Sequence, residues 1–196
     1  MAVVDPNCIM EIEAENIEVC YNEEIPKGLS EVGLFYIPAA HLKALEIPLQ
    51  TGDLESIVRV IKPIEAYEGK KFGRLMALVD ENELTSTITG NKGAKGDQTA
   101  LTFFLLGLRD KNKGLVKRYK SIPLVMIAKD RAGNKHLIGN LDNPAYMDTA
   151  EGTSGRTGED NPGYAITVNS PSFCYTLKAS FPGETPLPVP PAEGEG

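Results

Sequence analysis

Alternating apolar and polar residues mark the central part of this chain. Residues 83–89 (ELTSTIT) alternate strictly, with a threonine at every second position. Residues 98–107 (QTALTFFLLG) continue the alternation with larger apolar side chains. A repeat of two residues is typical of a β-strand that buries one face. Both segments therefore predict half-buried strands, and the predicted core face of the second holds Leu101, Phe103 and Leu105.

Other apolar runs predict further strands. Val32–Ile37 predicts a strand that Pro38 ends, because proline lacks the N–H group that a ladder needs. Pro38 is also suited to open a short helix that continues to Leu45. Leu124–Ala128 is apolar without a break, as expected of a strand buried on both faces. The remaining predicted strands cover residues 56–63, 71–79, 136–138, 164–168 and 173–181.

One short helix is predicted within the most basic part of the chain, residues 109–121 (RDKNKGLVKRYKS). Over residues 113–120 the apolar side chains of Leu115, Val116 and Tyr119 share one helical face. A basic helix can contact nucleic acid. We favour a solvated face instead, which could also pair with the acidic N-terminal segment of a neighbouring copy.

Polar segments between the strands predict turns. Asp80–Asn82 should join two antiparallel strands, and Asp130–Asn134 (DRAGN) should close a second hairpin. The glycine-rich segment 90–97 (GNKGAKGD) is predicted to be a flexible hairpin tip, and an ordered contact with a neighbouring subunit is the alternative. Lys92 and Lys95 could face an anion there, but the residue order of a phosphate-binding loop is missing.

Residues 139–163 are predicted to form mainly loop, because glycine and acidic residues are frequent in them. Their carboxylate and amide oxygens are ligands that calcium accepts. The residue order of an EF-hand is missing, so a calcium site is not favoured. The candidate oxygen ligands are Asn140, Asp142, Asp148, Glu151, Glu159, Asp160 and Asn161.

These elements together predict the fold class. About eight strands and one helix favour a mainly β fold, an antiparallel β-sandwich or partly closed barrel with one flanking short helix. A chain of 196 residues is expected to form a single domain. We divide it into an acidic N-terminal arm (1–27), a β-sandwich domain (28–181) and a Pro/Gly-rich tail (182–196) that should be extended and mobile.

The net charge of −7 limits the kinds of partner. Nucleic-acid binding gains affinity by releasing counterions at a basic surface, and the acidic balance of this chain disfavours it. The same charge would suit a surface past which DNA slides without sticking. No apolar run approaches the ~20 residues of a membrane-spanning helix, and the N-terminus lacks a secretory pattern. A soluble protein made in the cytoplasm is therefore expected.

Few side chains in this chain are suited to bond-breaking chemistry. The three cysteines, Cys8, Cys20 and Cys174, are predicted to be free thiols. His41 is predicted to be a surface or hydrogen-bonded histidine, and His136 an exposed strand residue, so neither is predicted to be catalytic. Sequence patterns for a serine nucleophile, a zinc site or a dinucleotide-binding loop do not occur. We therefore predict no catalytic residue, no metal site and no cofactor, and a protein that is not an enzyme.

Three segments carry a resemblance to a known family. They are the hairpin sequence Leu124–Asn140, the step Asn143–Tyr146, and Asn161–Tyr164 leading into the strand Ala165–Val168. Their order, together with the preceding strands and the short charged helix, resembles the tail tube proteins of long-tailed bacteriophages, the major tail protein family. The resemblance extends over roughly residues 50–181.

The resemblance implies a structural protein that is made in the host cytoplasm and built into the virion tail. In that family six subunits form a ring, their inner sheets join into a continuous β-barrel, and the rings stack into a tube. Genomic DNA passes through the lumen without specific binding. The implied partners are other copies in a homohexamer and other tail proteins, contacted through long loops and terminal arms. No membrane, metal or cofactor is implied.

Two alternatives remain open. The acidic N-terminal segment and the Pro-rich tail do not map onto the family core, so another virion β-protein, such as a tail terminator, a baseplate component or a capsid decoration protein, fits the same pattern. A monomeric β-sandwich that binds carbohydrate or peptide would need an exposed aromatic cluster. Most aromatic residues of this chain occupy predicted strand or core positions instead.

Overall fold

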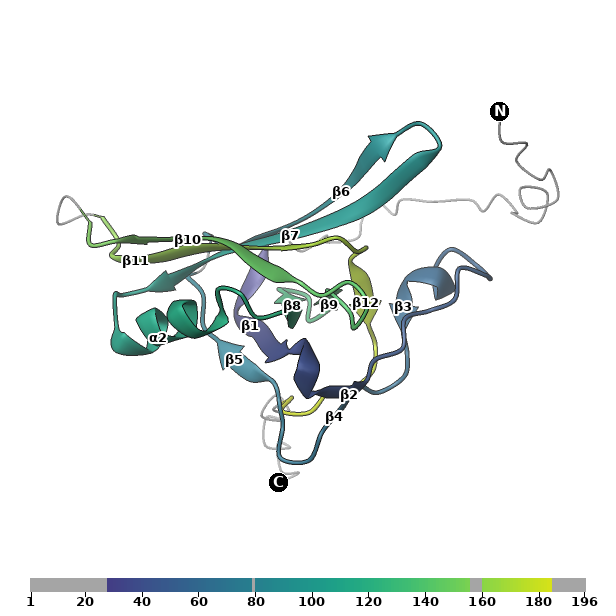
Figure 1. The fold of residues 1–196 in the computed structure, drawn as a ribbon, viewed down its shortest axis with the longest axis horizontal. Coiled ribbons are helices and arrows are strands. Elements are labelled where there is room, and N and C mark those ends of the chain that lie inside the picture. The colour runs from purple at the N-terminus through teal and green to yellow at the C-terminus, as the bar shows by residue number, and fades with distance from the viewer. Residues whose placement is uncertain (1–27, 79, 156–159, 185–196) are drawn as a thin grey trace, which may run out of the picture.

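A computed structural model describes residues 28–78, 80–155 and 160–184 (Figure 1). This part of the chain forms strands, one α-helix and two 3-10 turns. The strands are β1 (Leu29–Pro38), β2 (Leu42–Ala44), β3 (Arg59–Val60), β4 (Glu65–Ala66), β5 (Gly73–Leu75), β6 (Glu83–Asn91), β7 (Ala94–Leu106), β8 (Leu124–Asp130), β9 (Lys135–Ile138), β10 (Tyr146–Thr153), β11 (Gly163–Ser170) and β12 (Tyr175–Leu177). The helix is α2 (Asp110–Tyr119), and the turns are η1 (Ala39–His41) and η2 (Ser56–Val58).

A six-stranded sheet forms the centre of the molecule, with the strand order β3-β12-β9-β8-β1-β5. Its neighbouring strands are antiparallel except β3 and β12, which run parallel. Every residue of Leu124–Ala128 on β8 is buried, because both faces of this sheet are covered. The prediction of a strand buried on both faces is therefore confirmed.

One face of the central sheet packs against a four-stranded antiparallel sheet of order β10-β11-β7-β6 (Figure 1). Leu101, Phe103 and Leu105 lie in the shared core, as their alternation predicts. Helix α2 covers a flank of this core through Leu115 and Val116. The predicted fold class, a mainly β sandwich with one flanking helix, is confirmed, and neither sheet closes into a barrel within the described residues.

The other face of the central sheet is covered by the β2–β4 ribbon and by the connections around β3, β5 and β12. The Phe181 ring lies there edge-on to the rings of Phe35 and Phe72, with 5.1 Å between the centroids in each pair. Burying an aromatic side chain of this size stabilises a fold by about 1.5–3 kcal/mol. This second core therefore ties the C-terminal part of the chain to β1.

Pro38 ends β1 as predicted, but the expected helix up to Leu45 is wrong. The chain instead makes the three-residue turn η1 and continues as β2. The backbone N–H of Ala39 donates to the carbonyl oxygen of Pro123 at 2.9 Å, which fixes this corner to the segment before β8. Tertiary hydrogen bonding thus replaces the intrahelical bonds that a helix would have used.

Two predicted strands are much shorter than expected. Residues 56–63 form the turn η2 and the two-residue strand β3, and residues 71–79 contain only the three-residue strand β5. The turn Asp80–Asn82 does not join a hairpin, because β5 and β6 belong to different sheets. The chain changes sheets just before this turn, where the N–H of Leu78 donates to the carbonyl oxygen of Phe104 at 2.9 Å.

The glycine-rich segment 90–97 is a hairpin as predicted, but most of it is strand rather than loop. Strand β6 continues to Asn91 and β7 begins at Ala94, which is its register partner. Only Lys92 and Gly93 form the turn. Gly93 has a φ of 88°, a left-handed conformation that a two-residue hairpin turn requires and that glycine adopts at low cost.

Strand β10 lies within the segment predicted to be loop, so that part of the prediction for residues 139–163 is wrong. It pairs antiparallel with β11 from Tyr146 to Thr153, with a register shift between Met147 and Thr149. Asp148 and Gly152 have low strand propensity, which hid the strand in the sequence. Pairing with β11 on one side supplies the stabilisation that local propensity lacks.

The folded part of the chain continues beyond the boundary predicted at residue 181. The carbonyl oxygen of Pro182 accepts from the N–H of Phe72 at 2.9 Å, and the Glu184 carboxylate pairs with Lys129 at 3.1 Å and Lys135 at 3.2 Å. The predicted arm (1–27) and the rest of the predicted tail (185–196) lie outside the described residues.

Candidate functional surface

The side of the four-stranded sheet that faces away from the core forms a regular surface four strands wide. Strand alternation and cross-strand register place a defined set of side chains on it, which we call the outer face. Most of these residues are exposed or half-buried. The outer face comprises Tyr146, Thr149, Glu151 and Thr153 of β10, Gly163, Ala165, Thr167 and Asn169 of β11, Gln98, Ala100, Thr102, Phe104 and Leu106 of β7, and Glu83, Thr85, Thr87 and Thr89 of β6.

Hydroxyl groups dominate the outer face. Thr149, Thr167 and Thr102 follow one another across β10, β11 and β7 in register, and Glu83 continues the row on β6. The Oγ1 atoms of Thr102 and Thr167 are 3.2 Å apart and share a hydrogen bond. The threonine hydroxyls along β6 donate to carbonyl oxygens of β7, for example from Thr85 to Ala100 at 3.4 Å. The threonine side chains of β6 are therefore hydrogen-bonded to the neighbouring strand of their own sheet.

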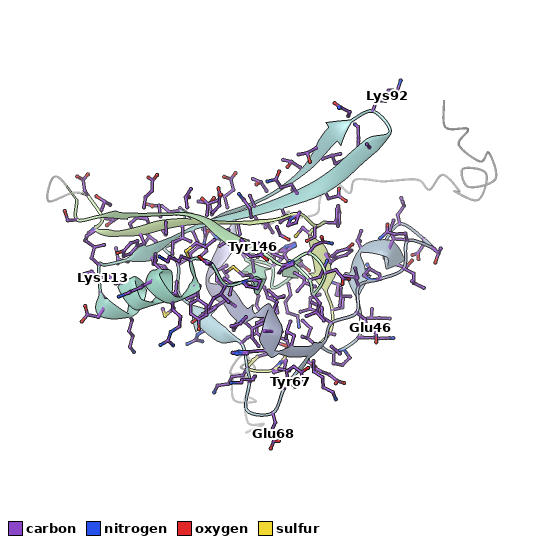
Figure 2. All side chains as sticks on the ribbon, viewed as in Figure 1. Glu46, Tyr67, Glu68, Lys92, Lys113 and Tyr146 are labelled. Carbon is purple, nitrogen blue, oxygen red and sulfur yellow. The ribbon has the colours of Figure 1, made fainter. Side chains whose placement is uncertain are left out.

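The outer face carries carboxylates and no positive charge. Glu83 and Glu151 belong to it, whereas none of its positions is lysine or arginine. The lysine at the hairpin tip, Lys92, lies far from the body of the sheet (Figure 2). A polyanion such as DNA would find hydroxyl groups and repulsive carboxylates here, and no group with which to form an ion pair.

The distal half of the β6–β7 hairpin projects beyond the rest of the molecule (Figure 1). All of its residues from 85 to 97 are exposed, and the Ile88 side chain is 70% exposed. A two-stranded ribbon with both faces in water is only marginally stable. Within the described residues this ribbon therefore gains little stabilisation from packing.

The four-stranded sheet also ends in two open strands. Among the described residues, β10 and β6 each pair on one side only. An exposed sheet edge presents unpaired N–H and C=O groups and is a template for pairing with another chain. Both edges border the outer face, so a sheet joined at these edges would extend that face without interruption.

Of the cysteines and histidines, the structure describes Cys174, His41 and His136. Burial raises the pKa of the Cys174 thiol to about 11, so this thiol is protonated at neutral pH and a poor nucleophile. His136 is half-buried rather than exposed as predicted, and its Nε2 lies 3.4 Å from a carboxylate oxygen of Asp130. His41 is half-buried in η1. Cys8 and Cys20 lie outside the described residues.

One of the candidate calcium ligands, Asn140, stabilises a turn. The Asn140 side-chain oxygen accepts from the backbone N–H groups of Asp142 at 2.9 Å and Asn143 at 2.7 Å, which forms a tight turn. Asp148 and Glu151 lie on β10 instead of a loop. Across residues 28–78, 80–155 and 160–184 no group of three or more His, Cys, Asp and Glu side chains could hold a metal ion. Glu159 is outside the described residues.

Sequence reasoning missed two features of this surface. Strand β10 was assigned to a loop, so the width of the sheet was underestimated. The regular Thr-x-Thr spacing of β6 was visible in the sequence, but its continuation across β7, β11 and β10 depends on long-range register.

Among the described residues no helix is long and apolar enough to cross a membrane.

Comparisons of this chain with protein-family models, with curated proteins and with solved structures find no match.

Proposed function

We propose that this chain is a virion structural protein that assembles into the tail tube of a long-tailed bacteriophage. Six copies form a ring by joining their four-stranded sheets, and rings stack into a tube whose lumen is lined by the outer face. The virion tail is its location, and the genome passes through the lumen during delivery. Other tail proteins cap and anchor the tube.

The observation that carries the proposal is the combination of an outer face without positive charge and two open edges that border it. DNA carries about one negative charge per 1.7 Å of helix axis, so any exposed lysine in a lumen would bind phosphates and slow its passage. The Debye length is about 8 Å at physiological salt, so carboxylates on the wall act on DNA in a narrow channel. Hydroxyls and carboxylates therefore suit a low-friction wall.

The projecting hairpin supports the stacking of rings. It leaves the plane of the sheet's body and exposes an apolar side chain, Ile88, on a ribbon that covers nothing within the described residues (Figure 1). A neighbouring ring would bury this ribbon and supply the partner that an isolated hairpin needs. Stacking of rings thus gives a role to the projecting β6–β7 hairpin, which would remain exposed to water in a monomer.

The test is the assembly state of the purified full-length protein, measured by light scattering and negative-stain electron microscopy. We expect rings or tubes that form with increasing protein concentration. Ile88→Lys should weaken stacking, whereas Ile61→Lys, at a position that is 74% exposed, should leave it unchanged. A strictly monomeric protein at high concentration would contradict the proposal, and single rings that never stack would favour a tail terminator instead.

A further inference from the structure

A groove with positively charged walls runs between helix α2 and the edge of the central sheet. It has a volume of about 690 Å³. Strand β5 and the residues that follow it form one wall, and α2 forms the other. Its floor is apolar and includes Leu75, Leu105 and Leu115, all of which pack in the core between the sheets. The groove meets the outer face at Leu106, which borders both.

Four cations surround this groove. Arg74 projects from β5, Arg109 precedes α2, and Lys111 and Arg118 lie on α2. All four side chains are exposed, and none of them forms an ion pair with another described residue. In a protein of net charge −7, such a concentration of unpaired positive charge marks a site for an anionic partner.

The groove also presents an open strand. Strand β5 pairs with β1, Phe35 opposite Arg74, and it is the last strand of the sheet on its other side among the described residues. Met76, which follows β5 in the groove wall, is 58% exposed. An extended peptide can add to such an edge, with main-chain hydrogen bonds for affinity and side-chain pockets for specificity.

The chain itself contains a segment with the matching pattern. Residues 10–24 read MEIEAENIEVCYNEE, with six glutamates and no lysine or arginine. Over residues 10–15 the acidic side chains alternate with methionine, isoleucine and alanine. In an extended conformation, successive side chains point to opposite sides, so one side is acidic and the other is apolar. These two sides match the charged walls and the apolar floor of the groove.

We propose that the groove between α2 and β5 binds the acidic N-terminal segment, residues 10–24, as an extended strand added to the edge of β5. The glutamates pair with the arginine and lysine side chains of the walls, and the apolar residues cover the floor. The 27 residues that precede Gly28 can extend to roughly 90 Å, so the segment can reach the groove of its own or of a neighbouring copy. The proposal holds whether or not tubes form.

Nucleic acid is the other anionic occupant that four cations could attract. A phosphate backbone neither packs against an apolar floor nor forms ladder hydrogen bonds with an open strand edge, whereas an alternating acidic peptide does both. The acidic balance of the whole chain also opposes the approach of a polyanion. The groove therefore fits a short acidic peptide better than DNA or RNA.

The experiment uses a native thiol of the segment, Cys20, in the full-length chain. A disulfide forms only when two Cα atoms come within about 7 Å, so we introduce Met76→Cys in the groove wall and oxidise under mild conditions. The control is Ile61→Cys, at a position that is 74% exposed outside the groove. Peptide mass spectrometry without reduction should show the 76–20 disulfide at a yield roughly tenfold above the 61–20 disulfide.

Charge reversal separates binding in the groove from chance collision. Arg118→Glu combined with Lys111→Glu should lower the crosslink yield of Met76→Cys to that of the control, and Glu13→Lys with Glu15→Lys should restore it. Thermal unfolding checks that each variant is folded. A dimer band or an internally crosslinked monomer supports the proposal and tells which copy supplies the segment. Equal crosslink yields at positions 76 and 61 would overturn the proposal. So would a crosslink yield that does not respond to charge reversal, if the Arg118→Glu and Lys111→Glu variant at the same time loses DNA binding.

Discussion

Glu184 shows how one side chain can fasten the segment after β12 to the central sheet. Its carboxylate lies between Lys129 and Lys135, and all three side chains are less than one quarter exposed. The Lys135 ammonium group also donates to the carbonyl oxygen of Ala179 at 2.7 Å and lies 5.6 Å from the centroid of the Phe181 ring. A single carboxylate therefore neutralises two partly buried cations and holds the C-terminal connection over the second core.

Removing this carboxylate should destabilise the fold in a pH-dependent way. Burial raises the pKa of Glu184, but hydrogen bonds and charge from Lys129 and Lys135 outweigh that effect, so its pKa is lowered overall. A carboxyl with a lowered pKa in the folded state stabilises above its ordinary pKa of about 4.3, and this contribution disappears as the pH falls through the folded-state pKa.

Glu184→Gln should therefore reduce the free energy of unfolding at pH 7 by about 1–2 kcal/mol, and the difference from the parent protein should disappear as the pH falls below the folded-state pKa of this carboxyl. Urea unfolding at several pH values measures this. Glu46→Gln, which removes an exposed pair with Lys62, serves as the control and should change the value by less than about 1 kcal/mol. A pH-independent loss in Glu184→Gln would contradict the electrostatic explanation.

Cys174 should react slowly with alkylating reagents. Its pKa of about 11 leaves about 0.1% thiolate at pH 8, against about a quarter for an ordinary cysteine thiol. Iodoacetamide labelling followed by peptide mass spectrometry should show slow modification in the native protein and fast modification in urea. Labelling of the native protein at the rate of the unfolded chain would show that burial does not protect this thiol.

At the scale of elements, glycines mark where strands and helices tolerate no side chain and where they would benefit from one. A Cβ atom at Gly163 on β11 would lie 2.3 Å from the carbonyl oxygen of Leu105 and 2.5 Å from the Phe104 ring. A Cβ atom at Gly114 on α2 would meet nothing within 4 Å. The two positions thus differ in their surroundings and not in residue type.

Substitution of these two glycines by alanine should have opposite effects. Gly163→Ala must push β11 away from β7 and should lower the free energy of unfolding by about 1–3 kcal/mol. Gly114→Ala should raise it by about 0.5–1 kcal/mol, because alanine loses less backbone entropy in a helix. Thermal or urea unfolding measures both, and an equal change of the same sign would show that the packing around Gly163 relaxes freely.

The elements that the sequence predicts well are those whose side-chain pattern is fixed by burial. Leu124–Ala128 is a continuous apolar run that is buried throughout, and in residues 98–107 the buried Leu101, Phe103 and Leu105 alternate with outer-face positions. Strand β10 was missed because its stability comes from pairing with β11 and its own residues are mostly polar or small. The change of sheet between β5 and β6 was missed as well, because it depends on a contact between Leu78 and Phe104 that no local pattern encodes.

The candidate surfaces also divide into features that local sequence patterns predict and features that depend on long-range contacts. The threonines along β6 were predictable from their spacing of two residues, and the apolar face of α2 was predictable from Leu115, Val116 and Tyr119. The helix begins at Asp110, three residues before the predicted start, where the Asn112 side chain donates to the carbonyl oxygen of Gly107 at 2.7 Å. The cationic groove required the relative placement of α2 and β5, which are far apart in the sequence.

At the scale of the whole molecule, charge is divided between surfaces. The outer face of the four-stranded sheet carries carboxylates and hydroxyls, whereas four cations gather at the groove beside α2. Exposure of both surfaces to water alone would not explain why the carboxylates and the cations lie on different surfaces. In the proposed tube, the outer face meets DNA and the groove meets an acidic segment of the same kind of chain, so each surface has the sign that its neighbour requires.

Reversing charge on the outer face should therefore change how assembled protein interacts with DNA. Glu151→Lys places a cation on an exposed position of β10, and in a ring of six copies it would give a closed band of positive charge. The matched control is Glu68→Lys, which makes the same charge change on a connection remote from the four-stranded sheet (Figure 2). Both variants should still assemble, as electron microscopy can verify.

Tubes of the parent protein and of Glu68→Lys should not retain DNA in a sedimentation assay at moderate ionic strength. Tubes of Glu151→Lys should retain it, and the retention should fall steeply with added salt, because each neutralised phosphate contributes about 0.9 to the slope of log affinity against log salt concentration. Strong, salt-sensitive retention by the parent protein would mean that the surface lining the lumen is not this acidic, hydroxyl-rich sheet face. The direction in which the sheet curves on assembly would then have to be the reverse of the one proposed.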